Sequence, residues 1–299
     1  MGKVIVIIGP TASGKTELSI KIAKLLNTEI ISADSRQCYK YLNIGTAKPT
    51  IEEQEGITHH FIDCFEPDYR FTAGMFAKQA NEIINKLLQQ NKNPIIVGGS
   101  GLYIEALIDG LQDSCDYDPI LRNRLLRDLN LYGTKFLYNQ LEIVDPDYAS
   151  RISSNDWRRI LRALEFYYLA QKTFSSLKKE MTSLHDFVII NIVRERSLLY
   201  ERINSRVDKM MKEGLIDEVK RILDMGYSKE LNSLNTVGYK EIIEYLDGKT
   251  DLYSAVEKIK KNTRNYAKKQ ITFFKKFEDR SLNINPDYQR LDFISDILN

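Results

Sequence analysis

The chain has 299 residues and 43% of them are hydrophobic, which is enough for one large domain or two modest ones. Charged residues make up 28% of the chain and give a formal net charge of only +2, so the overall charge does not indicate a nucleic-acid partner. No stretch approaches the roughly 18 apolar residues of a membrane span, and we find no signal-peptide or lipid-anchor pattern. We therefore expect a cytoplasmic protein with no membrane partner.

Cysteine and histidine usage argues against a disulfide framework and against a zinc site. The three cysteines are widely spaced and form no CxxC pair (Cys38, Cys64 and Cys115). His59 and His60 are adjacent, so on a strand they would face opposite sides and could not share a metal. We expect reduced thiols and structural histidines.

The first third of the chain alternates between strand and helix patterns. Val4–Ile8 is a continuous β-branched run followed by glycine, which is typical of a strand buried on both faces of a parallel sheet. The elements expected after it are a helix from Lys15, strands at Glu29–Ser32, Thr58–Ile62 and Pro94–Val97, and a helix from Phe76 to Leu88. This alternation predicts an α/β fold with a parallel sheet core like that of P-loop NTPases.

The pattern changes after about Gly110. Three segments have helical spacing with no strand between them: Leu121–Tyr132, Phe136–Ile143 and Asp156–Ala170. A strand pattern returns at Phe187–Val193, which we expect to be the last strand, and from Ser197 the chain has helical spacing almost to Lys276. We expect a first part of the core at 1–112, a mostly helical insertion domain at 113–186, and the completion of the core at 187–299.

A phosphate-binding motif follows the first strand directly and precedes the first helix. It matches GxxxxGK[ST] and consists of Gly9, Pro10, Thr11, Ala12, Ser13, Gly14, Lys15 and Thr16. In such a loop successive N–H groups face an anion and the helix N-terminus adds positive charge. Lys15 would then supply a charge to the terminal phosphates and Thr16 a hydroxyl to Mg²⁺.

The motif alone does not choose between ATP, GTP and a prenyl diphosphate. Phosphoryl-transfer enzymes usually carry an acid at the end of a central strand, but the strand at Pro94–Val97 ends in two glycines. The nearest acid is Asp34, after the second strand. It could act as a general base or as a Mg²⁺ partner, and it could equally be a helix cap.

Several motifs in a fixed order resemble the tRNA dimethylallyltransferase family, also called tRNA isopentenyltransferases. They are Gly9–Thr16, Ser32–Tyr39, Ile44–Pro49, His59–Asp63, Val97–Tyr103, Asn155–Arg159 with Arg162–Glu165, Val237–Glu241 and Thr263–Gln270. The resemblance covers most of the chain. It implies transfer of a dimethylallyl group from its diphosphate to N6 of the adenosine next to the anticodon, at tRNA position 37.

The resemblance also implies roles for individual residues. The phosphate loop would bind dimethylallyl diphosphate with Mg²⁺, Asp34 would be the base, and Arg206 would hold the departing pyrophosphate. Residues implied to contact the tRNA anticodon arm are Asp34, Ser35, Arg36, Gln37, Ser100, Arg158, Arg159, Ile160, Leu161 and Arg162. A monomer is the expected state.

A second basic stretch lies between Lys258 and Lys276, with eight basic residues, no acidic one, and the aromatic residues Tyr266, Phe273 and Phe274. It fits RNA contacts and base stacking, and it also fits a solvated helix face with an apolar underside.

Three rival functions remain open on the residues alone. One is a small-molecule kinase, against which the missing strand-end acid counts. Another is an isopentenyltransferase that uses free AMP or ATP, against which the helical insertion counts. The last is a nucleotide-dependent RNA-binding switch, which would need no base at Asp34.

Overall fold

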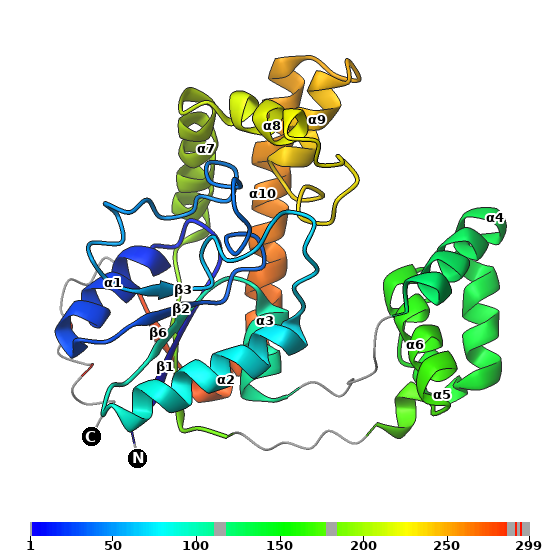
Figure 1. Cartoon of the computed structure of the whole chain (residues 1–299), viewed down its shortest axis with the longest axis horizontal. Helices are drawn as coiled ribbons and strands as arrows, with labels where there is room; N and C mark the ends of the chain where they lie inside the picture. Colours follow the sequence, from blue (N-terminus) through cyan, green and yellow to red (C-terminus); the bar gives the residue numbers. More distant parts are fainter. Residues whose placement is uncertain (1, 111–117, 178–183, 286–290, 292–293, 295–299) are drawn as a thin grey trace. The chain divides into compact units, whose positions relative to one another are not determined.

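The structure is a computed structural model that describes residues 2–110, 118–177, 184–285, 291 and 294. The chain divides into two compact units (Figure 1). The larger unit comprises Met1–Ile108 and Ser183–Asn299, and the smaller unit comprises Asp109–Thr182. The predicted boundary at 112/113 lies outside the described residues, and so does Cys115. The boundary at 186/187 coincides with the start of a strand at Phe187.

The larger unit is built on a six-stranded sheet in the order β3-β2-β4-β1-β5-β6, in which every neighbouring pair is parallel. The strands are β1 Val4–Ile8, β2 Ile30–Ser32, β3 His59–His60, β4 Ile95–Val97, β5 Phe187–Ile192 and β6 Ser281–Ile284. This confirms the predicted α/β fold with a parallel core. In a parallel sheet the carboxyl ends of all strands lie at one edge, where ligands bind.

Helices cover both faces of this sheet. They are α1 Lys15–Leu26, α2 Ala73–Gln89, α3 Gly101–Ile108, α7 Arg196–Lys212, α8 Leu215–Asp224, α9 Tyr239–Leu246 and α10 Leu252–Phe274, followed by the 3₁₀ turn η2 Lys275–Arg280. Side chains of β1 alternate between two hydrophobic clusters, because successive strand residues face opposite sides. Ile5 and Ile7 pack with α1, whereas Val4, Val6 and Ile8 pack with α2, α3 and α8 to α10.

Two predictions for the C-terminal part were wrong. β5 is not the last strand, because β6 pairs with it in parallel at the sheet edge. The chain is also not helical throughout from Ser197, because residues 225–238 between α8 and α9 form turns. β6 is only four residues long and Gly226 and Gly238 flank the run of turns, so neither segment offers the length of regular hydrophobic spacing on which such a prediction depends.

The smaller unit is helical among its described residues. It contains α4 Pro119–Val144, α5 Pro146–Ala149, α6 Trp157–Ala170 and the 3₁₀ turn η1 Phe174–Ser176. Gly133, with φ 79° and ψ 173°, interrupts α4 between the two segments that were predicted as separate helices. Leu137, Leu141 and Leu164 are fully buried, so this unit has a core of its own. Within the described residues, no helix is long and apolar enough to span a bilayer.

A buried carboxyl group fixes the loop that follows the Asp34 segment. Glu218 of α8 is 2% exposed and accepts hydrogen bonds from the main-chain N–H groups of Asn43, Ile44 and Gly45, at 2.8 to 3.1 Å. The Tyr239 hydroxyl donates to the same carboxyl group at 2.5 Å. Burial and the adjacent Glu218 raise the pKa of Tyr239, which therefore stays protonated as a donor.

We predict that Glu218→Ala lowers the free energy of unfolding by about 3 kcal/mol, because it leaves buried donors without an acceptor. Glu230→Ala, at an exposed position of the same unit, should change it by no more than about 0.5 kcal/mol. Chemical denaturation of both variants measures this, and equal losses would contradict the role given to Glu218.

Candidate active site

The loop after β1 has the backbone shape of an anion cradle. Gly9, Ala12 and Gly14 have φ values of 147°, 62° and 103°, so the chain turns its N–H groups toward one side. α1 begins at Lys15 without a side-chain cap. The Ser13 hydroxyl is buried and has no hydrogen-bond partner among the described residues. Unpaired donors at a helix N-terminus fit a bound phosphate group.

Two arginines donate hydrogen bonds to main-chain carbonyl groups of this loop. Arg194, directly after β5, donates from Nε to the Ser13 carbonyl at 2.7 Å. Arg202 of α7 donates from Nε to the Ala12 carbonyl at 2.9 Å. These bonds satisfy two carbonyl groups of the loop, so they stabilise its conformation.

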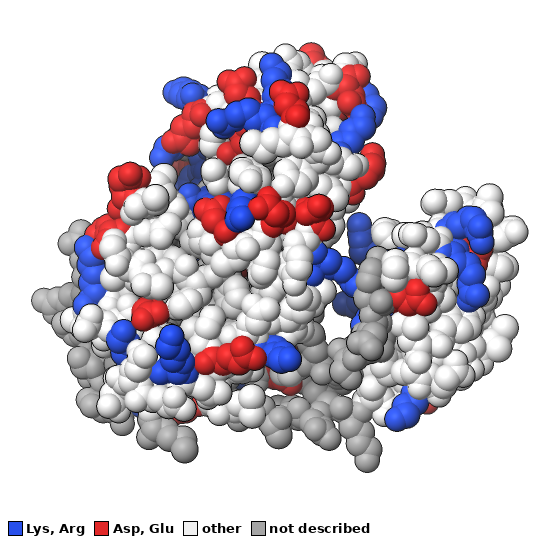
Figure 2. Space-filling view, viewed as in Figure 1, with Lys and Arg blue, Asp and Glu red and all other residues white. Residues whose placement is uncertain are grey.

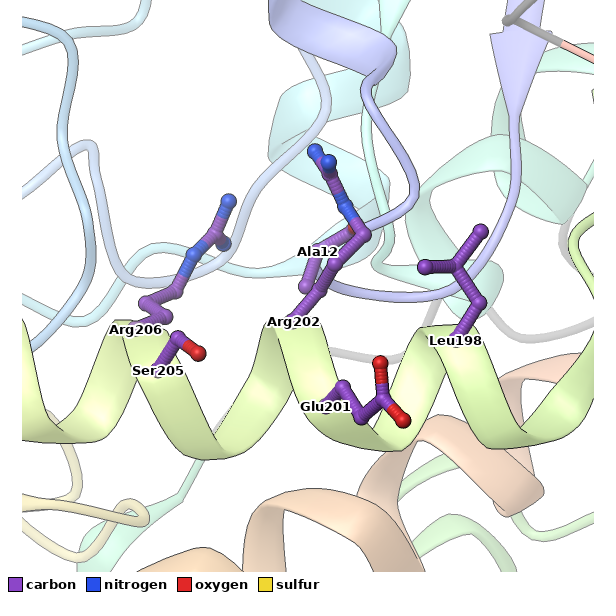
Figure 3. A pocket seen from close by; sticks show the side chains of 6 residues that line it. All are labelled: Ala12, Leu198, Glu201, Arg202, Ser205 and Arg206. Carbon is purple, nitrogen blue, oxygen red and sulfur yellow. The ribbon is translucent and has the colours of Figure 1, made fainter.

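Arg206, one turn further along α7, donates to the Thr11 hydroxyl at 3.4 Å. Burial, and the like charge of Arg202, lower the pKa of Arg206. Both side chains extend from α7 toward the loop (Figure 3). Arg202 and Arg206 line a pocket of about 340 Å³. Its other lining residues are Ala12 of the loop and Leu198, Glu201 and Ser205 of α7. A phosphate group beside this loop would meet strong positive charge.

Lys15 folds back onto its own loop. Its Nζ donates to the carbonyl groups of Gly9 at 2.9 Å and Pro10 at 2.7 Å. Burial of the ammonium group, and then the charge of Arg206, lower the pKa of Lys15 to about 7, while Asp34 acts in the opposite direction. Lys15 thus lies in the loop that Arg206 contacts at Thr11, and Asp34 follows β2 at the same edge of the sheet.

Asp34 reaches this position because the ends of β2 and β4 approach unusually closely. Ala33 N–H donates to the Val97 carbonyl at 2.7 Å, and Ser100 N–H donates to the Ala33 carbonyl at 3.2 Å. A Cβ atom at Gly98 would lie 2.1 Å from the Ala33 carbonyl oxygen. Glycine is therefore required here, which gives a structural reason why no acid stands at the end of β4.

The two oxygens of the Asp34 carboxyl group have different surroundings. Its Oδ1 accepts from the N–H groups of Arg36 at 2.8 Å and Gln37 at 3.3 Å, so it caps a turn rather than a helix. Its Oδ2 has no hydrogen-bond partner among the described residues. One oxygen therefore fixes the orientation of the group, and the other is available to accept a proton from a ligand.

Neighbouring polar groups line the same region. Ser100 Oγ accepts from the Ser35 N–H at 2.9 Å, which joins the β4 end to the Asp34 turn. Gln37 donates through Nε2 to the carbonyl groups of Thr46 and Ala47 at 3.2 and 3.1 Å.

The arginines predicted to contact RNA lie in the smaller unit. Arg158 and Arg159 are exposed on α6; Arg158 stacks on the Trp157 ring at 4.5 Å, and Arg159 lies 3.5 Å from the Asp156 carboxylate. Arg162 is half-buried, 3.7 Å from Glu165. Basic groups gather over part of this unit on the face seen in Figure 2. The two hydrophobic members of the set, Ile160 and Leu161, are fully buried, so their side chains belong to the core of this unit and only the arginines present side chains at its surface.

The basic stretch on α10 is only partly available. Carboxylates of the same unit lie next to three of its lysines, in the pairs Lys258–Glu244, Lys260–Asp208 and Lys276–Glu105. Phe274 is 2% exposed and belongs to the core, so it cannot stack on a base. Tyr266 keeps 41% of its surface exposed. Some residues of this stretch therefore form ion pairs or belong to the core, and others remain exposed to solvent.

Sequence reasoning missed three residues that shape the phosphate loop: Arg194, Arg202 and Gln270. Arg194 could have been found, because it follows a strand that neighbours β1 and so reaches the same sheet edge. Arg202 stands one helical turn before Arg206, a spacing that places both on one face. Gln270 had no such signal, since it lies 259 residues from the loop residue that it contacts.

Comparison with known proteins shows which family this chain is similar to. The model of a family described as IPP transferase matches residues 37–277. A tRNA dimethylallyltransferase of Alkaliphilus metalliredigens is 45% identical over 280 residues, which cover 93% of this chain and 90% of that protein. The corresponding protein of Thermotoga maritima is 46% identical over 277 residues, with the same coverage.

Solved structures give the same result. A tRNA isopentenylpyrophosphate transferase from Bacillus halodurans superposes with a TM-score of 0.72 at 38% identity, covering 100% of this chain and 95% of that one. A eukaryotic dimethylallyltransferase acting on tRNA gives a TM-score of 0.83 at 28% identity, covering 99% of this chain and 77% of that one. The family expected from the motifs is thus confirmed, and the chain belongs to the IPP transferase family.

Proposed function

We propose that this protein transfers the dimethylallyl group of dimethylallyl diphosphate to N6 of adenosine 37 in tRNA and releases pyrophosphate. The observation that carries the proposal is the placement of Asp34. Asp34 follows β2 and the phosphate loop follows β1, and both strands pair with β4, so a carboxylate suited to accept a proton and a cradle suited to hold a diphosphate share one sheet edge. Family membership supports the same reaction.

In this reaction negative charge develops on the bridging oxygen as the bond from carbon to oxygen breaks. With the diphosphate in the loop, the loop N–H groups, Lys15 and Arg206 would lie near that charge, and fixed donors stabilise it more than mobile water would. Arg194 and Arg202 contribute indirectly to this stabilisation, because their hydrogen bonds to loop carbonyl groups maintain the conformation of the loop. Leaving-group stabilisation is therefore the task of the loop and α7.

The exocyclic amine of adenine is neutral, and it becomes acidic only as it bonds to the allylic carbon. Asp34 Oδ2 can accept that proton while Oδ1 keeps the carboxyl group in place through Arg36 N–H. Because the target base cannot react while stacked in the anticodon loop, it must turn out of the stack to reach this acid.

Mg²⁺ fits the loop as a partner of the diphosphate. Among the described residues no group of three or more His, Cys, Asp or Glu side chains could hold a metal by itself. Thr16 stands exposed in the first turn of α1, where its hydroxyl and the ligand's own oxygens would hold the ion. When bound there, the metal would neutralise charge on the leaving group.

RNA recognition falls to both units in this proposal. Arg158, Arg159 and Arg162 of α6 would contact phosphates of the anticodon arm, and the Asp34 to Gln37 turn with Ser100 would contact the target base region. We expect the protein to act as a monomer in the cytoplasm. A kinase or an enzyme for free AMP would use the same cradle but would not need the smaller unit's exposed arginines.

Labelled dimethylallyl diphosphate, Mg²⁺ and either unmodified tRNA or AMP should yield label in tRNA only. Asp34→Asn keeps the Oδ1 acceptor but removes the base, so we expect the rate to fall on the order of a hundredfold to ten-thousandfold. Asp68→Asn, at an exposed position, is the control and should keep the wild-type rate. Full activity of the Asp34→Asn variant would remove this residue from the mechanism, and label in AMP would favour the alternative substrate.

Because the pKa of Lys15 is about 7 in the free protein, this residue is mostly neutral above that pH. A bound anion raises the pKa of Lys15, so binding takes up a proton and the affinity for pyrophosphate should fall as pH rises through 7 to 9, by at most about tenfold per pH unit. Calorimetry at several pH values without Mg²⁺ gives the Kd for pyrophosphate of wild type and of Lys15→Met. Pyrophosphate also ionises in this pH range, and comparing the two proteins removes that contribution because it is the same for both. Parallel curves for the two proteins would contradict it.

Arg158→Ala should raise the KM for tRNA several-fold and reduce the salt slope of tRNA binding by about one, because one phosphate contact is lost. The KM for dimethylallyl diphosphate is the internal control and should not change. Steady-state kinetics at several salt concentrations measure both values, and an unaltered tRNA titration would exclude this residue from the interface.

A further inference from the structure

The buried side-chain amide of one glutamine joins the phosphate loop to the end of β4, which is hydrogen-bonded to the Asp34 turn. Gln270 of α10 is 5% exposed. Its Oε1 accepts from the Thr11 N–H at 2.8 Å, and its Nε2 donates to the Gly99 carbonyl at 2.9 Å. The two partners fix the orientation of the amide, because a donor must face Oε1 and an acceptor must face Nε2.

Each end of this bridge continues into one half of the site. Thr11 is the residue whose hydroxyl accepts from Arg206. Gly99 is followed by Ser100, whose Oγ accepts from the N–H of Ser35, the residue after Asp34. A side chain of α10 therefore links the diphosphate cradle to the acid, in addition to the main-chain bonds between β1 and β4.

The contact between α10 and the 98–101 segment is close and leaves little room for adjustment. A Cβ atom at Gly99 would lie 2.2 Å from Gln270 Nε2, and one at Gly101 would lie 2.3 Å from the Phe273 ring. Two neighbouring glycines thus allow the helix to approach the main chain directly. Such packing transmits a displacement of the helix instead of absorbing it.

We propose that Gln270 is a positioning residue that sets the distance between the leaving-group cradle and the base Asp34. The inference rests on the proposed function, because it assigns the two halves of the site to the two substrates. Gln270 itself contacts neither reacting atom. Its loss should therefore reduce the rate of transfer and leave diphosphate binding intact, since Arg194 and Arg202 still hold the loop.

The test compares two substitutions with a matched control. Gln270→Glu has the same shape but cannot donate to the Gly99 carbonyl, and Gln270→Met has a similar length and makes neither bond. Gln89→Glu places the same chemical change at an exposed position of α2. For each protein, a titration with inorganic pyrophosphate gives the Kd and the number of binding sites. The kcat for transfer to tRNA is then divided by this number of sites.

We expect both Gln270 variants to lose on the order of tenfold to a hundredfold in kcat per site, because a small misplacement of reacting groups is costly. Their Kd for pyrophosphate should stay within about twofold of wild type, and Gln89→Glu should match wild type in both values. Counting sites removes any loss that comes only from unfolded protein.

Three results would overturn the inference: an unchanged kcat per site, a loss of pyrophosphate affinity as large as the loss of rate, or a loss confined to the charged Gln270→Glu variant. If wild type transferred no label to tRNA, the proposed function itself would fail. The two failures are therefore distinguishable.

Discussion

The meeting of two strand ends at Gly98 is the constraint on which the site depends. Hydrogen bonds from Ala33 to Val97 and from Ser100 to Ala33 draw the ends of β2 and β4 together, and the absence of a side chain at Gly98 permits it. The residue after Ala33 is the acid, and β4 lies beside β1, which leads into the phosphate loop. A carboxylate and an anion cradle thus come from separate segments to one sheet edge.

Much of the larger unit could be predicted from the sequence, because its elements have strong local signals. The β-branched run of β1, the glycine-lysine turn and the helical spacing of α1 agree with the structure to the residue at Val4–Ile8 and Lys15. The interruption of α4 at Gly133 was also visible in the sequence pattern, since two separate helices were predicted on either side of it. Local chemistry and tertiary structure require the same conformation there.

The rest depended on contacts between distant segments. β6 is four residues long and gains its stability from pairing with β5, so its own composition gave no strand signal. Ile160 and Leu161 could be matched to a binding segment by motif, but only packing shows that they form the core beneath the arginines. The same holds for Phe274, and for Glu218 and Gln270, whose main-chain partners are more than a hundred residues away in the chain.

The folded-back position of Lys15 has a consequence for ligand selection. In the resting protein its ammonium group already has two carbonyl acceptors, Gly9 and Pro10, so an incoming anion must compete with the protein's own main chain. A singly charged ion offers little in exchange for those two bonds. A ligand with several adjacent charged oxygens can replace them and also engage the helix end, so the loop discriminates by charge density before any recognition of the hydrocarbon or the base.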